Sequence, residues 1–252
     1  PNSRWYSGAG IYRPVWLCTM PKAHIEMRGI KIKTLSYDPP RFTVTVNTNA
    51  AGKVVAEIVD GDMLVASQSA ESGGQAVFDF TVPGAKLWSP ESPNLYTCRV
   101  TFGSDVREEE FGIRLLECDA KGGMRINGNR VILRGACIHH ENGILGAVNH
   151  PFADTRKIEL LKEYGYNAIR SAHNPTSLAT LKACDRLGVL VLDEYVDMWY
   201  IHKNKYDYAS QFSNEWKNDL KALVERDYNH PSVVMYSTGN EVAETGQKKG
   251  IE

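Results

Sequence analysis

The sequence has few cysteines and no excess of charge. Its five cysteines are far apart and form no C-x-x-C pair, so neither a disulfide framework nor a zinc cluster is indicated. Isolated thiols favour a reducing compartment, although a secreted protein can also carry few bridges. Twenty-nine Lys and Arg residues balance thirty Asp and Glu residues, which leaves a formal net charge of −1. Because a chain without a basic surplus has no electrostatic footprint for phosphate backbones or anionic lipids, we expect no nucleic-acid partner and no membrane partner.

Long apolar runs are also missing. No run reaches the ~18 residues of a membrane-spanning helix, and the first residues lack the pattern of a signal peptide. The chain instead starts abruptly in what looks like a strand, so we expect its natural beginning to lie upstream. Its location therefore stays open between the cytoplasm and the periplasm. The 252 residues, 42% of them hydrophobic, are enough for one large or two modest domains.

Residues 24 to 112 consist of short runs in which apolar and polar residues alternate. FTVTVNT, KVVAEIV and QAVFDFTV are three of about seven such runs, and turn-formers such as YDPP, DGD and ESGG separate them. This pattern predicts an antiparallel β-sandwich of about seven strands. Its polar residues occupy outward-facing positions and form no catalytic cluster, so we interpret this region as a supporting domain.

The pattern changes after Gly123. Four short apolar runs, RVILRG, NAIRS, VLVLDE and SVVMYS, alternate with helical segments. We expect Asp154 to cap the first helix and Gly188 to end the second. Strands that are apolar on both faces, in the order β-α-β-α-β-α-β, predict a parallel sheet covered by helices. Because the crossovers are right-handed, the carboxyl ends of all four strands should lie on one side of the sheet.

Polar side chains follow all four predicted strands. The opposite ends read as Gly-Val, Tyr-Asn or Pro-Ser, so the polar groups gather at one side, as on the active face of a β/α barrel. In chain order, these residues are His139, His140, Glu141, Arg170, His173, Asn174, Asp193, Glu194, Asn240 and Glu241.

Most of these residues could also serve the structure alone, without a role in binding or catalysis. The histidines could bond backbone carbonyls, Asp193 and Glu194 could bond a neighbouring loop and Arg170, and Glu141 could be a solvated carboxylate. Glu241 is the exception, because a carboxylate directly after a buried strand is costly unless it is used or paired.

A metal site is the tempting rival. His139, His140, Glu141 and His173 are side chains that zinc accepts. However, the H-H-E run lacks helical i, i+4 spacing, and adjacent histidines on an extended segment point to opposite faces. We therefore predict no protein-held metal and no cofactor, and leave open a weakly held magnesium or sodium ion in a longer protein.

Several long motifs resemble glycoside hydrolase family 2, whose members include β-galactosidases, β-glucuronidases and β-mannosidases. They are RVILRGACIHHE, NAIRSAHNP, VLVLDE and, above all, ERDYNHPSVVMYSTGNE; upstream, NSRWYSGAGIYRPVWL and LWSPESPNLY resemble segments of the same family. The resemblance implies three regions. Residues 1–22 would end a jelly-roll sugar-binding domain, residues 23–114 would form an immunoglobulin-like sandwich, and residues 115–252 would form the N-terminal half of a (β/α)8 TIM-barrel catalytic domain.

The resemblance also implies roles for the polar residues. Glu241 matches the family's general acid/base, and Asn240 matches the amide that bonds the sugar's 2-hydroxyl. His139 and His173 match histidines that contact the sugar ring. Four further residues are assigned to the substrate site or its support: Arg170, Asn174, Asp193 and Glu194. The chemistry suits these residue types, because glycoside hydrolysis needs a protonated carboxyl beside the leaving oxygen and a second carboxylate ~5 Å away if configuration is retained.

That second carboxylate has no counterpart in the sequence. A closed barrel takes eight strands and about 250 residues, whereas this region has four strands, and the family's nucleophilic glutamate lies near the end of the seventh. We therefore predict a retaining, β-galactosidase-like glycosidase that acts on terminal β-linked sugars, with residues 1–252 inactive alone and self-associating through exposed strand edges. The alternatives are a non-catalytic carbohydrate-binding or scaffolding module and a metallohydrolase. The sugar and the linkage stay open.

Overall fold

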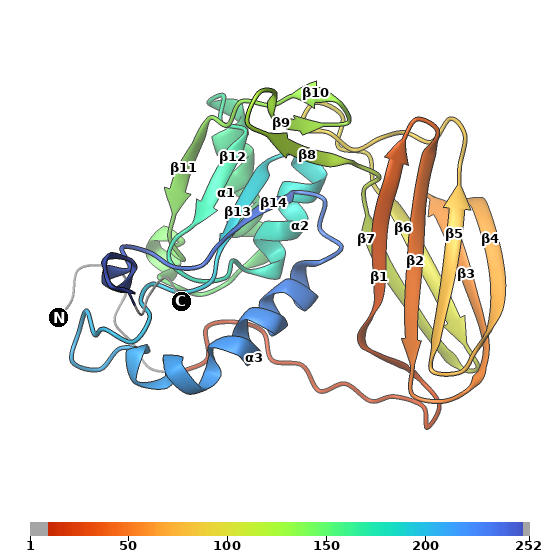
Figure 1. Ribbon diagram of the computed structural model, residues 1–252, viewed down its shortest axis with the longest axis horizontal. Coiled ribbons are helices and arrows are strands. Elements are labelled where there is room, and N and C mark those ends of the chain that lie inside the picture. Colours follow the sequence, from red (N-terminus) through yellow and green to blue (C-terminus); the bar gives the residue numbers. More distant parts are fainter. Residues whose placement is uncertain (1–9, 249–252) are drawn as a thin grey trace. The chain divides into compact units, whose positions relative to one another are not determined.

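The computed structural model describes residues 10–248. Two compact units divide this part of the chain (Figure 1). One contains residues 15–132 and 228–231, and the other contains residues 10–14, 133–227 and 232–248. Each unit has a hydrophobic core built from its own residues.

The first unit is a sandwich of two antiparallel sheets. One sheet has the order β1 (Ile25–Tyr37), β2 (Pro40–Thr48), β5 (Gln75–Thr81). The other has the order β4 (Met63–Ser72), β3 (Gly52–Asp60), β6 (Tyr96–Phe102), β7 (Asp105–Phe111). Three strands facing four in this order is an immunoglobulin-like arrangement, so the predicted sandwich is confirmed.

Alternation along the strands builds the sandwich core. In β2, Phe42, Val44 and Val46 are fully buried, while the residues between them are partly exposed. The Phe42 ring lies 5.5 Å from that of Phe80 and 5.2 Å from that of Phe111. Burying one such ring contributes about 1.5–3 kcal/mol, so these three rings are a large part of what holds the two sheets together.

A small sheet that the sequence pattern did not predict follows the sandwich. It consists of β8 (Leu116–Asp119), β9 (Gly123–Ile126) and β10 (Asn129–Arg130). Asp119 organises its first turn by accepting hydrogen bonds from the backbone N–H groups of Lys121 and Gly122. These strands are too short and too polar for an alternating pattern to stand out.

The second unit contains a parallel four-stranded sheet. Its order is β11 (Gly135–Ile138), β12 (Ala168–Ser171), β13 (Leu190–Glu194), β14 (Val233–Ser237). Together with its helices, this sheet is the start of a TIM barrel, as predicted. The first strand was predicted too early, because pairing with β12 begins only at Gly135. The preceding Arg134 N–H instead donates to the side chain of Asn167, so the apolar run before it lies outside the ladder.

Helices cover one face of this sheet. The helices of the unit are α1 (Pro151–Glu163), α2 (Leu178–Leu187) and α3 (Ala209–Asp227), and two short 3-10 turns are η1 (Gly143–Leu145) and η2 (Ala243–Gly246). Ile158 of α1 and Leu181 of α2 pack in one cluster with Ile169 and Val191 of the strands. Because side chains alternate along a strand, Arg170 and Leu192 project from the opposite face, where they line a hollow.

The two predicted helix boundaries had different outcomes. The first helix starts at Pro151 with His150 as its N-cap, and Asp154 lies within the first turn. The prediction of Asp154 as the cap was therefore wrong, because proline favours the first helical position. The second helix ends at Gly188 in the left-handed conformation, with φ of 70°, as predicted.

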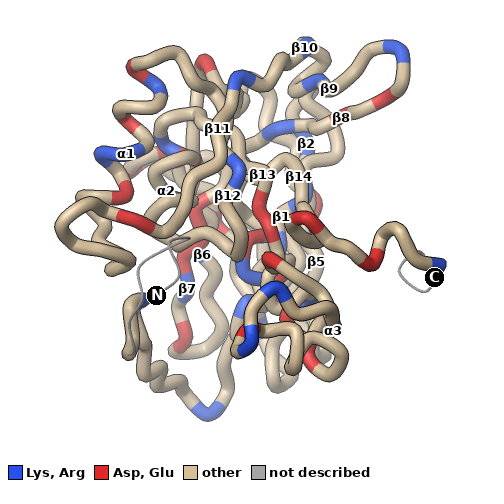
Figure 2. Tube along the Cα trace, turned by 90° about the vertical axis from the view of Figure 1, so that its left-hand side faces the viewer, with Lys and Arg blue, Asp and Glu red and all other residues tan. Residues whose placement is uncertain are grey.

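Charges of both signs are interspersed along the chain (Figure 2). Of the helices among residues 10–248, none is long and apolar enough to cross a membrane.

Candidate active site

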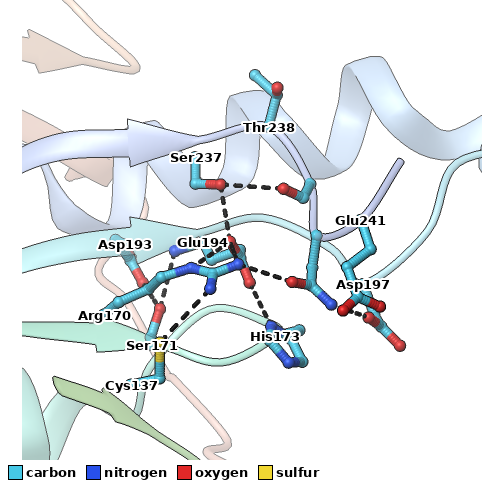
Figure 3. Close-up of polar contacts among 12 residues, drawn as sticks. Cys137, Arg170, Ser171, His173, Asp193, Glu194, Asp197, Ser237, Thr238 and Glu241 are labelled. Atoms are coloured by element: carbon cyan, nitrogen blue, oxygen red, sulfur yellow. Dashed lines mark hydrogen bonds and ion pairs between the residues drawn. The ribbon is translucent and has the colours of Figure 1, made fainter. Parts of the chain in front are cut away.

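A buried carboxylate lies at the centre of the polar cluster. Glu194 is the last residue of β13, and its side chain has no exposed surface. Arg170 donates to its Oε2 from Nε at 2.8 Å and from Nη2 at 2.6 Å, and Ser237 donates to the same oxygen at 2.7 Å. Figure 3 shows these side chains reaching Glu194 from β12 and β14. Pairing with a guanidinium and a hydroxyl offsets the cost of burying the negative charge.

His173 occupies the other oxygen of Glu194. Its Nδ1 lies 2.7 Å from Oε1, and the peptide before it is cis. This contact holds the His173 ring against Glu194 through Nδ1. The ring of His139 meets that of His173 edge-on, with 5.1 Å between centroids. The two histidines predicted to contact sugar are therefore neighbours.

Asn240 is fixed at both ends of its amide. Its Oδ1 accepts from Arg170 Nη2 at 2.9 Å, and its Nδ2 donates to Asp197 Oδ1 at 2.8 Å. These partners assign the orientation of the amide, since a guanidinium only donates and a carboxylate only accepts. The bond to Asp197 uses one of the two N–H groups on Nδ2, so the second can donate to a ligand.

Glu241 is more exposed than the sequence suggested. Residues 238–240 separate it from the end of β14, and its side chain is 75% exposed. The prediction of a carboxylate directly after a buried strand was therefore wrong. The chain leaves the sheet after Ser237, where the carbonyl of Thr238 accepts from Trp199 Nε1 and Asn240 N–H donates to the carbonyl of Val196. Glu241 itself has a φ of 48°.

Asp193 and Asn174 do not join the Glu194 cluster. Asp193 is fully buried, and its Oδ1 accepts from Ser171 Oγ at 2.9 Å and from Thr176 N at 3.1 Å. Burial, followed by the neighbouring Asp227, raises the pKa of Asp193 to about 7. Asn174 accepts a hydrogen bond from Arg13 at 3.3 Å. Because adjacent residues of a strand point to opposite faces of the sheet, the side chains of Asp193 and Glu194 lie in different clusters.

Arg13 also lies at this site, although no pattern in the sequence pointed to it. Its Nη2 lies 2.6 Å from Nε2 of His140 and donates to the carbonyl of Pro175 at 2.7 Å. Burial, and then the charge of Arg13, lower the pKa of His140 to about 4. The ring of His140 therefore contacts Arg13, whereas the rings of His139 and His173 contact each other.

Asp197, Lys203 and Ser237 were also missed. Asp197 and Lys203 lie in the long loop after β13, and their place beside Asn240 depends on the path of that loop. Ser237 ends a strand that was predicted, and its position beside Asn240 and Glu241 was the one available signal.

No group of three or more His, Cys, Asp or Glu side chains in residues 10–248 is arranged to hold a metal ion. Cys137, an exposed thiol, instead accepts a hydrogen bond from Arg170 Nη1 at 3.5 Å.

Family comparisons match both parts of the chain. The family described as "Glycosyl hydrolases family 2, TIM barrel domain" matches residues 119–251, which is more than half of the sequence. The chain belongs to glycosyl hydrolase family 2. The model described as "Glycosyl hydrolases family 2" matches residues 24–114 as well. The name of this family describes glycosyl hydrolases, and its TIM-barrel model matches the second part of the chain.

Curated family members with similar sequences include enzymes with two named activities. Beta-galactosidase BoGH2A of Bacteroides ovatus is 40% identical over 97% of this chain and 31% of that protein. A putative beta-glucuronidase of Formosa agariphila is 35% identical over 96% of this chain and 24% of that protein. The chain therefore spans about a third or less of the length of these family 2 relatives.

Solved structures of the family have the same fold. A glycosyl hydrolase family 2 member from Bacteroides cellulosilyticus superposes with a TM-score of 0.91 at 38% identity, covering 98% of this chain and 35% of the other. A beta-glycosidase from Bacteroides vulgatus gives a TM-score of 0.87 at 33% identity, covering 95% of this chain and 33% of the other.

Proposed function

We propose that the protein to which these residues belong is a retaining, β-galactosidase-like glycosidase with Glu241 as its general acid/base. The observation that carries the proposal is the Asn240 amide, which Arg170 and Asp197 hold in one orientation beside Glu241. Such an amide can donate to a sugar hydroxyl, and this bond strengthens as positive charge develops on the ring. The 40% identity to a protein named a beta-galactosidase supports the choice of sugar.

In the proposed mechanism, Glu241 donates a proton to the leaving oxygen and later accepts one from water. His173 presents Nε2 to a sugar hydroxyl while Glu194 holds its ring. Arg170 keeps its contacts with both Glu194 and Asn240, so one guanidinium sets two of the groups that face the substrate. Such pre-set groups need no rearrangement when the reaction occurs.

We further propose that the nucleophilic carboxylate comes from outside residues 1–252. The buried carboxylates near Asn240 are already engaged: Glu194 by Arg170 and His173, and Asp197 by Asn240 and Lys203. Residues 1–252 alone should accordingly hydrolyse no glycoside. Pairing of two copies along the edges β11 and β14, and the domain limits 1–22, 23–114 and 115–252, belong to the same proposal.

The test is a panel of nitrophenyl and phenyl glycosides assayed on the full-length protein with Glu241→Gln. Loss of acid assistance should slow phenyl glycosides by about 10²–10⁴-fold. Dinitrophenyl glycosides, whose leaving groups need little protonation, should lose far less of their first-step rate. Glu225→Gln, a change at a half-buried glutamate of α3, serves as the matched control and should leave both rates unchanged.

Equal losses on the two classes of substrate would contradict the role of Glu241. Sugar binding measured by calorimetry, without turnover by the full-length protein, would instead favour a non-catalytic carbohydrate-binding module.

A further inference from the structure

A lysine from the loop after β13 lies beside the acid/base. Lys203 belongs to the segment between β13 and α3, and its side chain is only 18% exposed. Its Nζ donates to the backbone carbonyl of Asp197 at 2.8 Å, to Asp197 Oδ1 at 2.9 Å and to the backbone carbonyl of Asn240 at 2.6 Å. A half-exposed surface lysine would not gather three acceptors, because ordering its long side chain costs entropy.

The number of donors limits what this ammonium can do. A lysine ammonium has three N–H groups, and the three acceptors use all of them. Glu241 Oε2 lies 3.7 Å from Nζ, which is an ion-pair distance and not a hydrogen bond. Lys203 therefore lies beside Glu241 without a hydrogen bond to it, which leaves the carboxyl oxygens of Glu241 for a substrate.

The carbonyl of Asn240 belongs to the peptide bond that joins Asn240 to Glu241. Holding that carbonyl fixes the peptide plane from which the Glu241 side chain starts. The same ammonium holds Asp197, which in turn accepts from the Asn240 side chain at 2.8 Å. The Lys203 ammonium thus contacts the backbone carbonyl of Asn240 directly and is linked to the Asn240 side chain through Asp197.

The loop also fixes Lys203 itself. Asp207 Oδ2 accepts from the backbone N–H groups of Lys203 at 2.7 Å and Asn204 at 2.8 Å. Burial raises the cost of ionising Asp207, but hydrogen bonds from Asn204, Ala209 and Lys203 outweigh it and lower the pKa of this carboxyl, so it stays ionised. The base of the lysine side chain is anchored before the ammonium reaches its three acceptors.

We propose that Lys203 is a positioning residue for Glu241: it holds the Asn240–Glu241 peptide so that the carboxyl group faces the leaving oxygen. This inference rests on the proposed glycosidase function and adds Lys203, a residue of the long loop after β13, to the residues that support the site. Lys203 is not a catalytic residue, because its contacts are with Asp197, Asn240 and Glu241.

The experiment compares Lys203→Met with Lys205→Met. Methionine keeps the length of the lysine stem and removes all three donors. Lys205 lies in the same loop with its Nζ 5.0 Å from the centre of the Tyr206 ring, so its replacement is a matched control. Each variant is assayed in the full-length protein on phenyl and dinitrophenyl glycosides, and amide hydrogen exchange over residues 238–242 is measured in the 252-residue chain.

Lys203→Met should slow phenyl glycosides at least about tenfold more than dinitrophenyl glycosides, because only the former need the aligned acid. Exchange over residues 238–242 should become faster, while Lys205→Met should change neither readout. Equal losses on both substrates, or unchanged exchange at residues 238–242, would overturn the proposal.

Two further arms keep the test decisive. If Lys203→Met does not fold, Lys203→Arg replaces it: a guanidinium keeps the charge but cannot place three N–H groups on one nitrogen, so the same split should appear at smaller size. If the unmodified full-length protein hydrolyses no glycoside, the glycosidase proposal fails, and exchange over residues 238–242 alone decides the positioning role.

Discussion

Two adjacent carboxyl groups at the end of β13 meet opposite surroundings. Glu194 is buried against the guanidinium of Arg170, with 2.6 Å between Nη2 and Oε2. Asp193 is equally buried but lies beside Asp227, and its pKa is raised to about 7. Arg226 Nη2 is 3.9 Å from Asp193 Oδ2, whereas it lies 2.7 Å from Asp227 Oδ2. The two neighbouring side chains therefore meet different partners at this strand end, a guanidinium for Glu194 and a second carboxyl group for Asp193.

Arg13 should control the ionisation of His140. Replacing Arg13 with Met removes a positive neighbour but leaves most of the burial, so the pKa of His140 should rise from about 4 toward its ordinary value of 6.5. NMR titration of the ring protons measures this directly, with His202, a half-exposed ring elsewhere in the unit, as an unchanged internal control. An unmoved midpoint would contradict the assignment.

The same shift has a consequence for stability. The His140 pKa is about 4 in the folded protein and 6.5 for an ordinary histidine, so the unfolded chain binds the extra proton between these values. The contribution of His140 to folding is therefore present above pH 6.5 and is lost as the pH falls toward 4. Arg13→Met should narrow the pH range over which the stability depends on His140, because the pKa of His140 in the folded protein moves closer to 6.5.

The sequence allowed secondary-structure elements to be predicted more reliably than the contacts between them. The strands of the sandwich could be predicted because alternation is a local property, visible in runs such as Phe42–Val46. The start of β11 could not, because the run before Gly135 is as apolar as a strand, and only pairing with Ala168 decides. At the candidate site, Glu194 and Asn240 could be found at strand ends. Lys203 could not be found in this way, because the path of a long loop cannot be read from the spacing of its residues in the sequence.

Within the second unit, α2 depends on a single buried cap. Ser177 Oγ accepts from Thr180 N at 3.1 Å and donates to Asp154 Oδ2 at 3.2 Å. Ser177→Ala should lower the free energy of unfolding by about 1–2 kcal/mol, because it removes the cap and a bond to a buried carboxylate. Denaturant titration measures the loss, and Ser213→Ala, an exposed serine in α3, should change it little. Equal effects of the two variants would show that the cap contributes nothing.

At the scale of the whole molecule, two separate cores imply separable stabilities. Phe42 lies among the buried residues of the sandwich, and Ile169 lies in the cluster beneath α1 and α2. Phe42→Ala should cost the sandwich about 3–5 kcal/mol through lost burial and a cavity. Hydrogen exchange should accelerate in β2 and β5 and stay unchanged in β12 and β13. Equal acceleration in both units would mean that they unfold as one.

The backbone of Glu241 has a consequence of its own. A φ of 48° lies in the left-handed region, which costs a residue with a side chain about 1–2 kcal/mol and costs glycine almost nothing. Selection for folding alone would favour glycine at this turn. A carboxylate at this position trades stability for the proposed proton donor, so libraries screened only for heat resistance should replace Glu241 with glycine.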